Sequence, residues 1–397
     1  MASTAPGAPI ASATLYIDLG TAYVRAAAKL SNGTVKYLEP KGHQCLPTYL
    51  SLLSSGSQSE TFIGEDAKEL SSTSLHNVAF YPTLFLRPEA NPSWFGNGSA
   101  TVTELLGKFL AELRNLCCDE IGDNVVITDC VITAHNIPLL KSKLLPAFSL
   151  TGFQRVAFKE RQQMQMYGLL TNFPELQRDR THLVVIRMGA AFTSLSVCEL
   201  GNRQHKVTIV RPEEIFGGND IDVLLMNHAI QEFEKLYEIR GQNYCTESLH
   251  RLRLKSEQVK IQLSTARAVT LQVRQFHAGC DLVVEFTVEK FREIVGSACY
   301  QLLRRVTDRV LNYIRELRKT VRYEVVLLGG TSKIPLIHEM VTWMMRRPHY
   351  RARSVMDTLT LSGMTMAHSE KYEEVTTTNG ALALRGGFPF RSRFSCL

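Results

Sequence analysis

A chain of 397 residues with 45% hydrophobic and 21% charged side chains has the composition of a globular protein, built as two or three domains or as one large bilobed fold. No apolar run approaches the length of a membrane-spanning helix, so we expect no membrane partner. The formal net charge of +7 permits an acidic partner such as RNA or a ribosomal surface, although a mildly basic solvent-exposed surface explains the same excess.

The cysteines and the first residues bear on the compartment. Nine cysteines are present, and their spacings fit neither a zinc site nor a disulfide framework. Reduced thiols are typical of cytosolic proteins, which favours a cytoplasmic location. Residues 1–12 are rich in Ala, Ser and Pro and contain no Lys or Arg, unlike a signal peptide or an Arg-rich transit peptide. We expect a short disordered tail there.

The first part of the chain predicts a β-meander followed by helices and strands. Apolar residues alternate from Leu15 to Leu30, and Asn32-Gly33 can adopt the positive φ angles of a hairpin turn. Helical spacing of apolar residues predicts an amphipathic helix from Thr103 to Cys118. The segment from Pro88 to Ser99 is expected to be a loop. Other strands are expected at Val35 to Leu38, Leu46 to Leu53, Val125 to Thr133 and Val156 to Phe158, and other helices at Ala67 to Leu70, Leu139 to Phe148 and Glu160 to Leu170.

The same order of elements then recurs. Strands are expected at Leu183 to Met188, Thr193 to Glu199, Lys206 to Arg211, Val269 to Val273, Leu282 to Thr287 and Glu324 to Leu328, and helices at Asp220 to Leu236, Leu249 to Leu263, Val288 to Leu317 and Met340 to Met345. Two successive meander-plus-helix halves suggest an internal duplication. The alternative is a single Rossmann sheet. The hairpin at Asn32-Gly33 argues against it, because a Rossmann unit needs a helical crossover after its first strand.

Six short motifs occur along the chain in a fixed order. They are Tyr16 to Thr21 (YIDLGT), Pro47 to Leu50 (PTYL), Ile63 to Lys68 (IGEDAK), Phe216 to Asp222 (FGGNDID), Arg251 to Ser264 and Val325 to Pro335 (VVLLGGTSKIP). Together they resemble the nucleotide-binding domain of the DnaK-type, 70-kDa heat-shock chaperones, from about Leu15 to Leu384. The resemblance implies an α/β protein of the actin-like ATPase fold, with two duplicated lobes around a nucleotide cleft.

The resemblance also implies the domain boundaries. Residues 13–175 and 355–397 would form the first actin-like lobe, and residues 176–354 would form the second. Neither an acidic-leucine linker nor a β-sandwich follows Leu384 in this sequence, so we expect no substrate-binding domain.

Nucleotide contacts are carried over from the family motifs residue by residue. Gly20 and Thr21 match the first phosphate loop, where glycine lets backbone N–H groups approach phosphates. The other nucleotide-binding candidates are Gly189, Gly217, Gly218, Glu257, Lys260, Ser264, Gly329, Gly330 and Lys333. Asp18 would orient a metal-bound water, and Glu160 keeps the place of a glutamate in the family's cleft. ATP or ADP is the implied ligand.

Departures from the family pattern concentrate around the phosphates. The second loop reads RMGAAFTS from Arg187 to Ser194, where the family has DLGGGTFD, so an arginine replaces the acid that helps to hold hydrated magnesium. The family's cleft lysine falls at Thr83, and Lys159-Glu160-Arg161 has lost the family's proline. We therefore assign no catalytic residue. Asp18 alone would be a poor anchor for Mg²⁺, so the metal is left open, with Asp18 as at most one of its ligands.

Arg187 has two interpretations at this stage. Its guanidinium could replace part of the magnesium charge and bind a phosphate, because it is permanently charged and can donate two parallel hydrogen bonds. It could instead pair with Asp18 and close an empty cleft.

The favoured function is that of a degenerate chaperone-like nucleotide-binding domain, a pseudo-ATPase that acts as scaffold, cochaperone or regulatory subunit with other proteins as partners. The alternative is a slow ATP-binding and ATP-hydrolysing chaperone of the DnaK type. An actin-like or sugar-kinase-like enzyme is disfavoured by the helix containing Glu257 and Lys260 and by the Phe216-Gly217-Gly218 helix start. A subunit of a larger assembly such as a ribonucleoprotein is compatible with the net charge.

Overall fold

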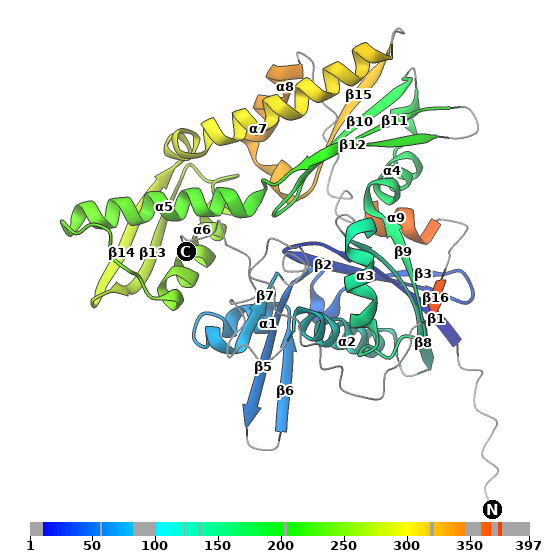
Figure 1. The fold of residues 1–397 in the computed structure, drawn as a ribbon, viewed down its shortest axis with the longest axis horizontal. Coiled ribbons are helices and arrows are strands. Elements are labelled where there is room, and N and C mark those ends of the chain that lie inside the picture. Colours follow the sequence, from blue (N-terminus) through cyan, green and yellow to red (C-terminus); the bar gives the residue numbers. More distant parts are fainter. Residues whose placement is uncertain are drawn as a thin grey trace, which may run out of the picture. The chain divides into compact units, whose positions relative to one another are not determined.

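A computed structural model of the protein describes residues 11–55, 58–81, 101–122, 124–134, 137–178, 180–201, 205–317, 321–345, 359–366 and 372–374. These residues form two compact units (Figure 1). The first runs to Gly168 and takes in the late elements α9 and β16, and the second runs from Leu169 to the end of α8. Thr83, the Pro88 to Ser99 segment and both chain ends lie outside the described residues.

The first unit is built on a seven-stranded sheet with the order β16-β9-β8-β1-β2-β3 and with β4 beside β2. Its strands are β1 (Ala11–Leu19), β2 (Tyr23–Leu30), β3 (Val35–Leu38), β4 (Leu46–Pro47), β8 (Val125–Ala134), β9 (Arg155–Glu160) and β16 (Tyr372–Glu374). A smaller sheet contains β5 (Tyr49–Ser55), β6 (Gln58–Ile63) and β7 (Val78–Phe80). The helices are α1 (Glu65–Leu70), α2 (Val102–Ile121), α3 (Ile137–Phe148), α4 (Arg161–Asn172, which continues into the second unit) and α9 (Leu359–Met366), with 3-10 turns η1 (Pro40–Gly42) and η2 (Leu75–Asn77).

Alternation along β1 explains why helices cover both faces of this sheet. Successive strand residues point to opposite faces. Leu15 and Ile17 are fully buried in a core shared with α2 and α3, whereas Tyr16 belongs to a second core with Met164 of α4 and Leu361 of α9. The long helix α2 begins with a capping box in which Thr101 and Glu104 satisfy each other's backbone N–H groups, as expected for a buried amphipathic helix.

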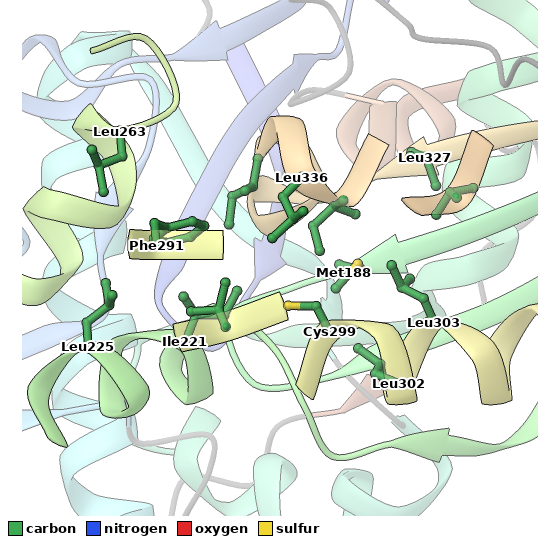
Figure 2. Close-up of a cluster of buried hydrophobic side chains, with 14 of the residues drawn as sticks. Met188, Ile221, Leu225, Leu263, Phe291, Cys299, Leu302, Leu303, Leu327 and Leu336 are labelled. Atoms are coloured by element: carbon green, nitrogen blue, oxygen red, sulfur yellow. The ribbon is translucent and has the colours of Figure 1, made fainter. Parts of the chain in front are cut away.

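The second unit contains a four-stranded sheet, β12-β11-β10-β15, and a two-stranded sheet. The strands are β10 (His182–Met188), β11 (Thr193–Glu199), β12 (Lys206–Glu214), β13 (Ala268–His277), β14 (Cys280–Thr287) and β15 (Tyr323–Leu328). The helices are α5 (Gly218–Leu236), α6 (Thr246–Gln262), α7 (Val288–Glu316) and α8 (Pro335–Met345), with 3-10 turns η5 (Pro174–Gln177) and η6 (Gly330–Lys333). Figure 2 shows buried side chains of these elements, including Met188, Leu225, Leu302 and Leu336, meeting in one core.

Both units repeat one arrangement of strands. In the first, β1, β2 and β3 form an antiparallel meander and β8 lies parallel to β1. In the second, β10, β11 and β12 form the meander and β15 lies parallel to β10. The predicted duplication is therefore present, and the Rossmann alternative is wrong because the first two strands of each unit are antiparallel.

Several predicted boundaries differ from the structure. Glu160 is the last residue of β9 and does not begin a helix. The predicted strand from Leu46 to Leu53 is divided at Thr48, whose backbone N–H and hydroxyl donate to the carbonyls of Ala22 and Thr21. The last helix of the second unit begins at Pro335, well before Met340. The strands β6 and β7 and the helix α9 were not predicted. No helix in the described ranges combines the length and apolar character needed to cross a bilayer.

Gly363 fixes the place where α9 crosses α4. A Cβ built on Gly363 would lie 1.8 Å from the carbonyl oxygen of Met164 and 3.0 Å from the backbone nitrogen of Gly168. Both are backbone atoms, so a larger residue fits only if a helix moves. Gly296, within α7, is the opposite case, because a Cβ there meets nothing within 4 Å.

We predict that Gly363→Ala lowers the free energy of unfolding by about 2 kcal/mol, because overpacking against backbone outweighs the better helix propensity of alanine. The matched variant Gly296→Ala should raise it by about 0.5–1 kcal/mol, since only the propensity changes. Urea denaturation of the two variants and the wild type measures both effects. Equal stability of the two variants would contradict this view of the helix crossing.

Candidate functional site

Two predicted site residues of the first unit lie at one edge of its sheet. The parallel strands β1, β8 and β9 are neighbours, so their carboxyl ends meet at this edge, which is where α/β proteins commonly bind ligands. Asp18 is in register with Thr133, and the next row contains Ala134 and Glu160. The predicted pair Asp18 and Glu160 is thus brought to the same end of three strands.

The carboxylate of Asp18 is neutralised within its own unit. Arg161, the first residue of α4, donates from Nε to Asp18 Oδ1 at 2.8 Å and from Nη2 to the carbonyl of Leu19 at 2.5 Å. The hydroxyl of Thr133 donates to the same Oδ1 at 3.0 Å. The side chains of Arg161 and Asp18 are only 3% and 7% exposed. The permanent positive charge of Arg161 therefore neutralises the Asp18 carboxylate. The family resemblance assigns this carboxylate to the orientation of a metal-bound water.

Internal contacts also fix the first predicted phosphate loop. A Cβ on Gly20 would lie 2.3 Å from the carbonyl oxygen of Tyr23, so only glycine permits this turn. The carbonyl of the neighbouring Thr21 accepts a hydrogen bond from the Thr48 hydroxyl. The loop has the tight geometry that its sequence predicts.

In the second unit, Arg187 stands at the position equivalent to Asp18. Each is the residue before the last of its strand, β10 or β1. Arg187 pairs across the sheet with Ser194 of β11 and Leu328 of β15, just as Asp18 pairs with a residue of β2 and with Thr133 of β8. The internal duplication thus sets a cation in one unit where the other has an acid.

The guanidinium of Arg187 folds over the second predicted phosphate loop. The backbone N–H of Gly189 donates to the carbonyl of Phe192 at 2.8 Å, which closes a tight turn. A Cβ on Gly189 would lie 3.0 Å from Nη1 of Arg187. Ala191 and Phe192, which replace a glycine and a threonine of the family, are both buried. Side chains of the protein, those of Arg187, Ala191 and Phe192, therefore fill space beside the second predicted phosphate loop.

Four predicted glycines of the second unit converge, and we call Gly189, Gly217, Gly218 and Gly329 the glycine cluster. The Gly218 N–H and the Thr331 hydroxyl both donate to the Gly189 carbonyl, at 3.0 and 2.8 Å. A Cβ on Gly217 would lie 2.4 Å from the Gly189 carbonyl oxygen, and one on Gly329 would lie 2.2 Å from that of Met188. The glycines are required because backbone packs directly on backbone here.

The predicted residues of α6 lie beside this cluster. Nζ of Lys260 donates to the carbonyl of Gly218 at 2.9 Å and to the Asp222 carboxylate at 2.8 Å. Glu257, one turn earlier, is buried. Ser264 donates weakly to the carbonyl of Lys260 at 3.4 Å and lines a cavity of about 230 Å³ between the end of α6, the start of α7 and the start of α8.

The remaining candidates of the second unit are open to solvent. Gly330 and Lys333 are exposed at η6, and a Cβ on Gly330 would meet nothing within 4 Å. Steric crowding therefore does not require glycine at position 330, in contrast to the cluster. Asp18, Gly20, Thr21 and Glu160 belong to the first unit, so the structure groups the candidates as two separate sets.

Four residues that contact the predicted site residues were not predicted from the sequence. They are Arg161 and Thr133 in the first unit, and Asp222 and Thr331 in the second. Arg161 stands in the segment that had lost the family's proline, which was the available signal. Asp222 lay within the FGGNDID motif and Thr331 directly after Gly330, but neither partner follows from spacing in the sequence.

We predict that Arg161→Met lowers the free energy of unfolding by about 3–5 kcal/mol, because it leaves the Asp18 carboxylate buried without its cation. The double variant Asp18→Asn/Arg161→Met should recover much of this loss. Arg155→Met is the control, since Arg155 also pairs with a carboxylate, that of Asp129, but is 46% exposed and should contribute less than about 1 kcal/mol. Chemical denaturation that finds equal losses for the two single variants would refute the assignment.

Comparison with known proteins agrees with this fold. The family model described as Hsp70 protein matches residues 166–355. A ribosome-associated molecular chaperone of Zygosaccharomyces rouxii is 23% identical over 82% of this chain and 56% of its own length, and its counterpart of the same name in Eremothecium gossypii is 22% identical over 83% and 57%. Heat shock 70 kDa protein 2 of Paracoccidioides lutzii is 26% identical over 41% of this chain and 24% of its own length.

The chain thus spans little more than half the length of the two ribosome-associated relatives. The matched segment contains the second meander, the glycine cluster and helix α6, which carry the family motifs of the second unit. These similarities support a member of the 70-kDa heat-shock protein family, and the family implies the actin-like ATPase fold of its nucleotide-binding domain.

Proposed function

We propose that this chain is a pseudo-ATPase of the 70-kDa heat-shock family that acts as a scaffold, cochaperone or regulatory subunit. The observation that carries the proposal is the buried pair of Asp18 and Arg161. Hydrolysis of ATP depends on an oriented water and on cations that neutralise the developing phosphate charge. A carboxylate held by a guanidinium and a threonine hydroxyl is poorly suited to orient that water.

The donor groups around Asp18 do not fit Mg²⁺. Magnesium requires near-octahedral oxygen ligands and usually keeps several waters. Oδ1 of Asp18 already accepts hydrogen bonds from Arg161 and Thr133, and the described residues contain no group of three or more His, Cys, Asp and Glu that could hold a metal ion. Arg187 adds a positive charge to the second unit where the family has an acid. The proposal keeps phosphate binding as the interpretation of Arg187, because Arg161 already pairs with Asp18.

Nucleotide binding without hydrolysis is part of the proposal. The family binds ATP and ADP, and the second unit retains the glycine cluster, the buried Glu257, Lys260 and the open Gly330. We infer that ATP or ADP binds with contacts from these groups of the second unit. The units would correspond to the two actin-like lobes, residues 13–175 with 355–397 and residues 176–354.

Partners are proposed from the relatives and from charge. Two relatives are named as ribosome-associated chaperones, and the net charge of +7 suits an acidic surface, so a ribosome or chaperone complex is the proposed setting. A cytoplasmic location is supported by the cysteines of the described ranges, which form no disulfide.

We predict that the purified chain releases no phosphate from MgATP above the background of an Asp18→Asn variant, because Asp18 no longer activates a water. Steady-state phosphate release measures this, with a hydrolysing 70-kDa heat-shock protein as positive control. Release at the rate of that control, abolished by Asp18→Asn, would overturn the proposal in favour of an active chaperone ATPase.

A further inference from the structure

The contacts of Lys260 join two helices of the second unit. Nζ lies 2.7 and 2.8 Å from the two carboxylate oxygens of Asp222 and donates to the carbonyl of Gly218, both on α5. The side chains of Lys260 and Asp222 are 12% and 3% exposed. The three N–H groups of the Lys260 ammonium can thus all be used by acceptors of the second unit: the two oxygens of Asp222 and the carbonyl of Gly218.

The same ammonium fills space beside the glycine cluster. A Cβ built on Gly218 would lie 3.0 Å from Lys260 Nζ and 2.7 Å from the Thr331 hydroxyl oxygen. The lysine that the family motif assigns to a ligand is therefore in contact with the first residue of α5. A ligand group that binds this ammonium must compete with Asp222.

We propose that Lys260 and Asp222 form a latch that a ligand at the glycine cluster must open. With the latch closed, the ammonium is committed to α5. With the latch open, it is available to hydroxyl or phosphate oxygens of a nucleotide. The inference rests on the proposed nucleotide binding and adds a regulation of that same site.

The charges around Asp222 make the latch sensitive to acid. Burial raises the pKa of Asp222 from 3.8 to about 6, because the attraction of Lys260 and Arg253 only partly offsets desolvation, and Glu257 adds repulsion. On α5 itself, burial also raises the pKa of Asp220, whose carboxylate accepts the Gly217 N–H. On α6, Arg253 and Glu257 are thus the charged groups besides Lys260 that act on Asp222, and Asp220 of α5 is itself attracted by Lys260.

The sign of the effect follows from the raised pKa. Between pH 6 and pH 4 the folded chain holds a proton on Asp222 that the unfolded chain lacks, so acidification favours the fold through this group. The same proton removes the negative charge that binds Lys260. Mild acid should therefore open the latch without unfolding the unit.

Hydrogen exchange of the first turn of α5 tests the latch without a ligand. Asp222→Asn removes the charge and keeps the shape, so at pH 7.5 its exchange should be roughly tenfold faster than in the wild type, the factor expected for one charge-assisted hydrogen bond. At pH 5 the exchange rates of the variant and the wild type should agree, because Asp222 of the wild type is then protonated and uncharged. A difference of equal size at both pH values, or none at pH 7.5, would overturn the latch.

Calorimetry with ATP at pH 7.5 in EDTA tests the competition. Asp222→Asn should bind roughly tenfold more tightly than the wild type, for the same reason. Asp308→Asn is the matched control, because Asp308 is 61% exposed and lies 3.9 Å from Arg304 on α7, and its affinity should equal that of the wild type. Unchanged or weaker affinity of Asp222→Asn, or no ATP binding by any variant, overturns the latch. Phosphate release by the wild type would overturn only the pseudo-ATPase proposal.

Discussion

At the carboxyl ends of β1, β8 and β9, a guanidinium and a carboxylate share a site from which water is nearly excluded. Burying either charge alone would cost several kcal/mol, so each group depends on the other. The pair ties the end of β1 to the start of α4, and Thr133 adds β8 to the same contact. The ion pair therefore connects the carboxyl ends of these strands to α4, which packs together with α9 on one face of the sheet.

The residues that the fold requires can be distinguished from those that phosphoryl transfer would require. The fold keeps the glycines that allow backbone to pack on backbone, as at Gly217 and Gly329, because they are needed for packing whether or not a nucleotide is hydrolysed. The charges follow a different pattern. Arg161 pairs with the acid of one unit, and Arg187 replaces the acid at the equivalent position of the other. On the proposed function, a fold of the ATPase type persists while the groups that phosphoryl transfer requires are rearranged.

Much of the architecture could be predicted from the sequence because it depends on local patterns. The meander followed from alternation and the Asn32-Gly33 turn, where Gly33 has a φ of +87°. Amphipathic spacing marked α2. The strand β7 and the helix α9 were missed because their place depends on segments distant in the chain, whereas β6 was missed although it pairs with the preceding strand β5. Glu160 was assigned to a helix because the periodicity of α4 continues back into the end of β9.

The candidate site was predictable in its glycines but not in its ion pairs. Motifs identify residue types at fixed spacing, and the tight turns at Gly20 and Gly189 depend on such spacing. The partners of Asp18 and Lys260 lie far along the chain, at Arg161 and Asp222, and no local pattern links them. The alternative that Arg187 pairs with Asp18 came from the motif positions alone, and Arg161, which lies beside Glu160 where the family's proline is lost, was overlooked.

The most direct test of the account is the magnesium dependence of ATP binding, measured by calorimetry on the wild-type chain in excess Mg²⁺ and in EDTA. The central claim is that Asp18 is neutralised by Arg161 and does not anchor a hydrated metal. The account predicts the same response to ATP in both buffers. Strong binding in Mg²⁺ that falls steeply in EDTA would contradict it.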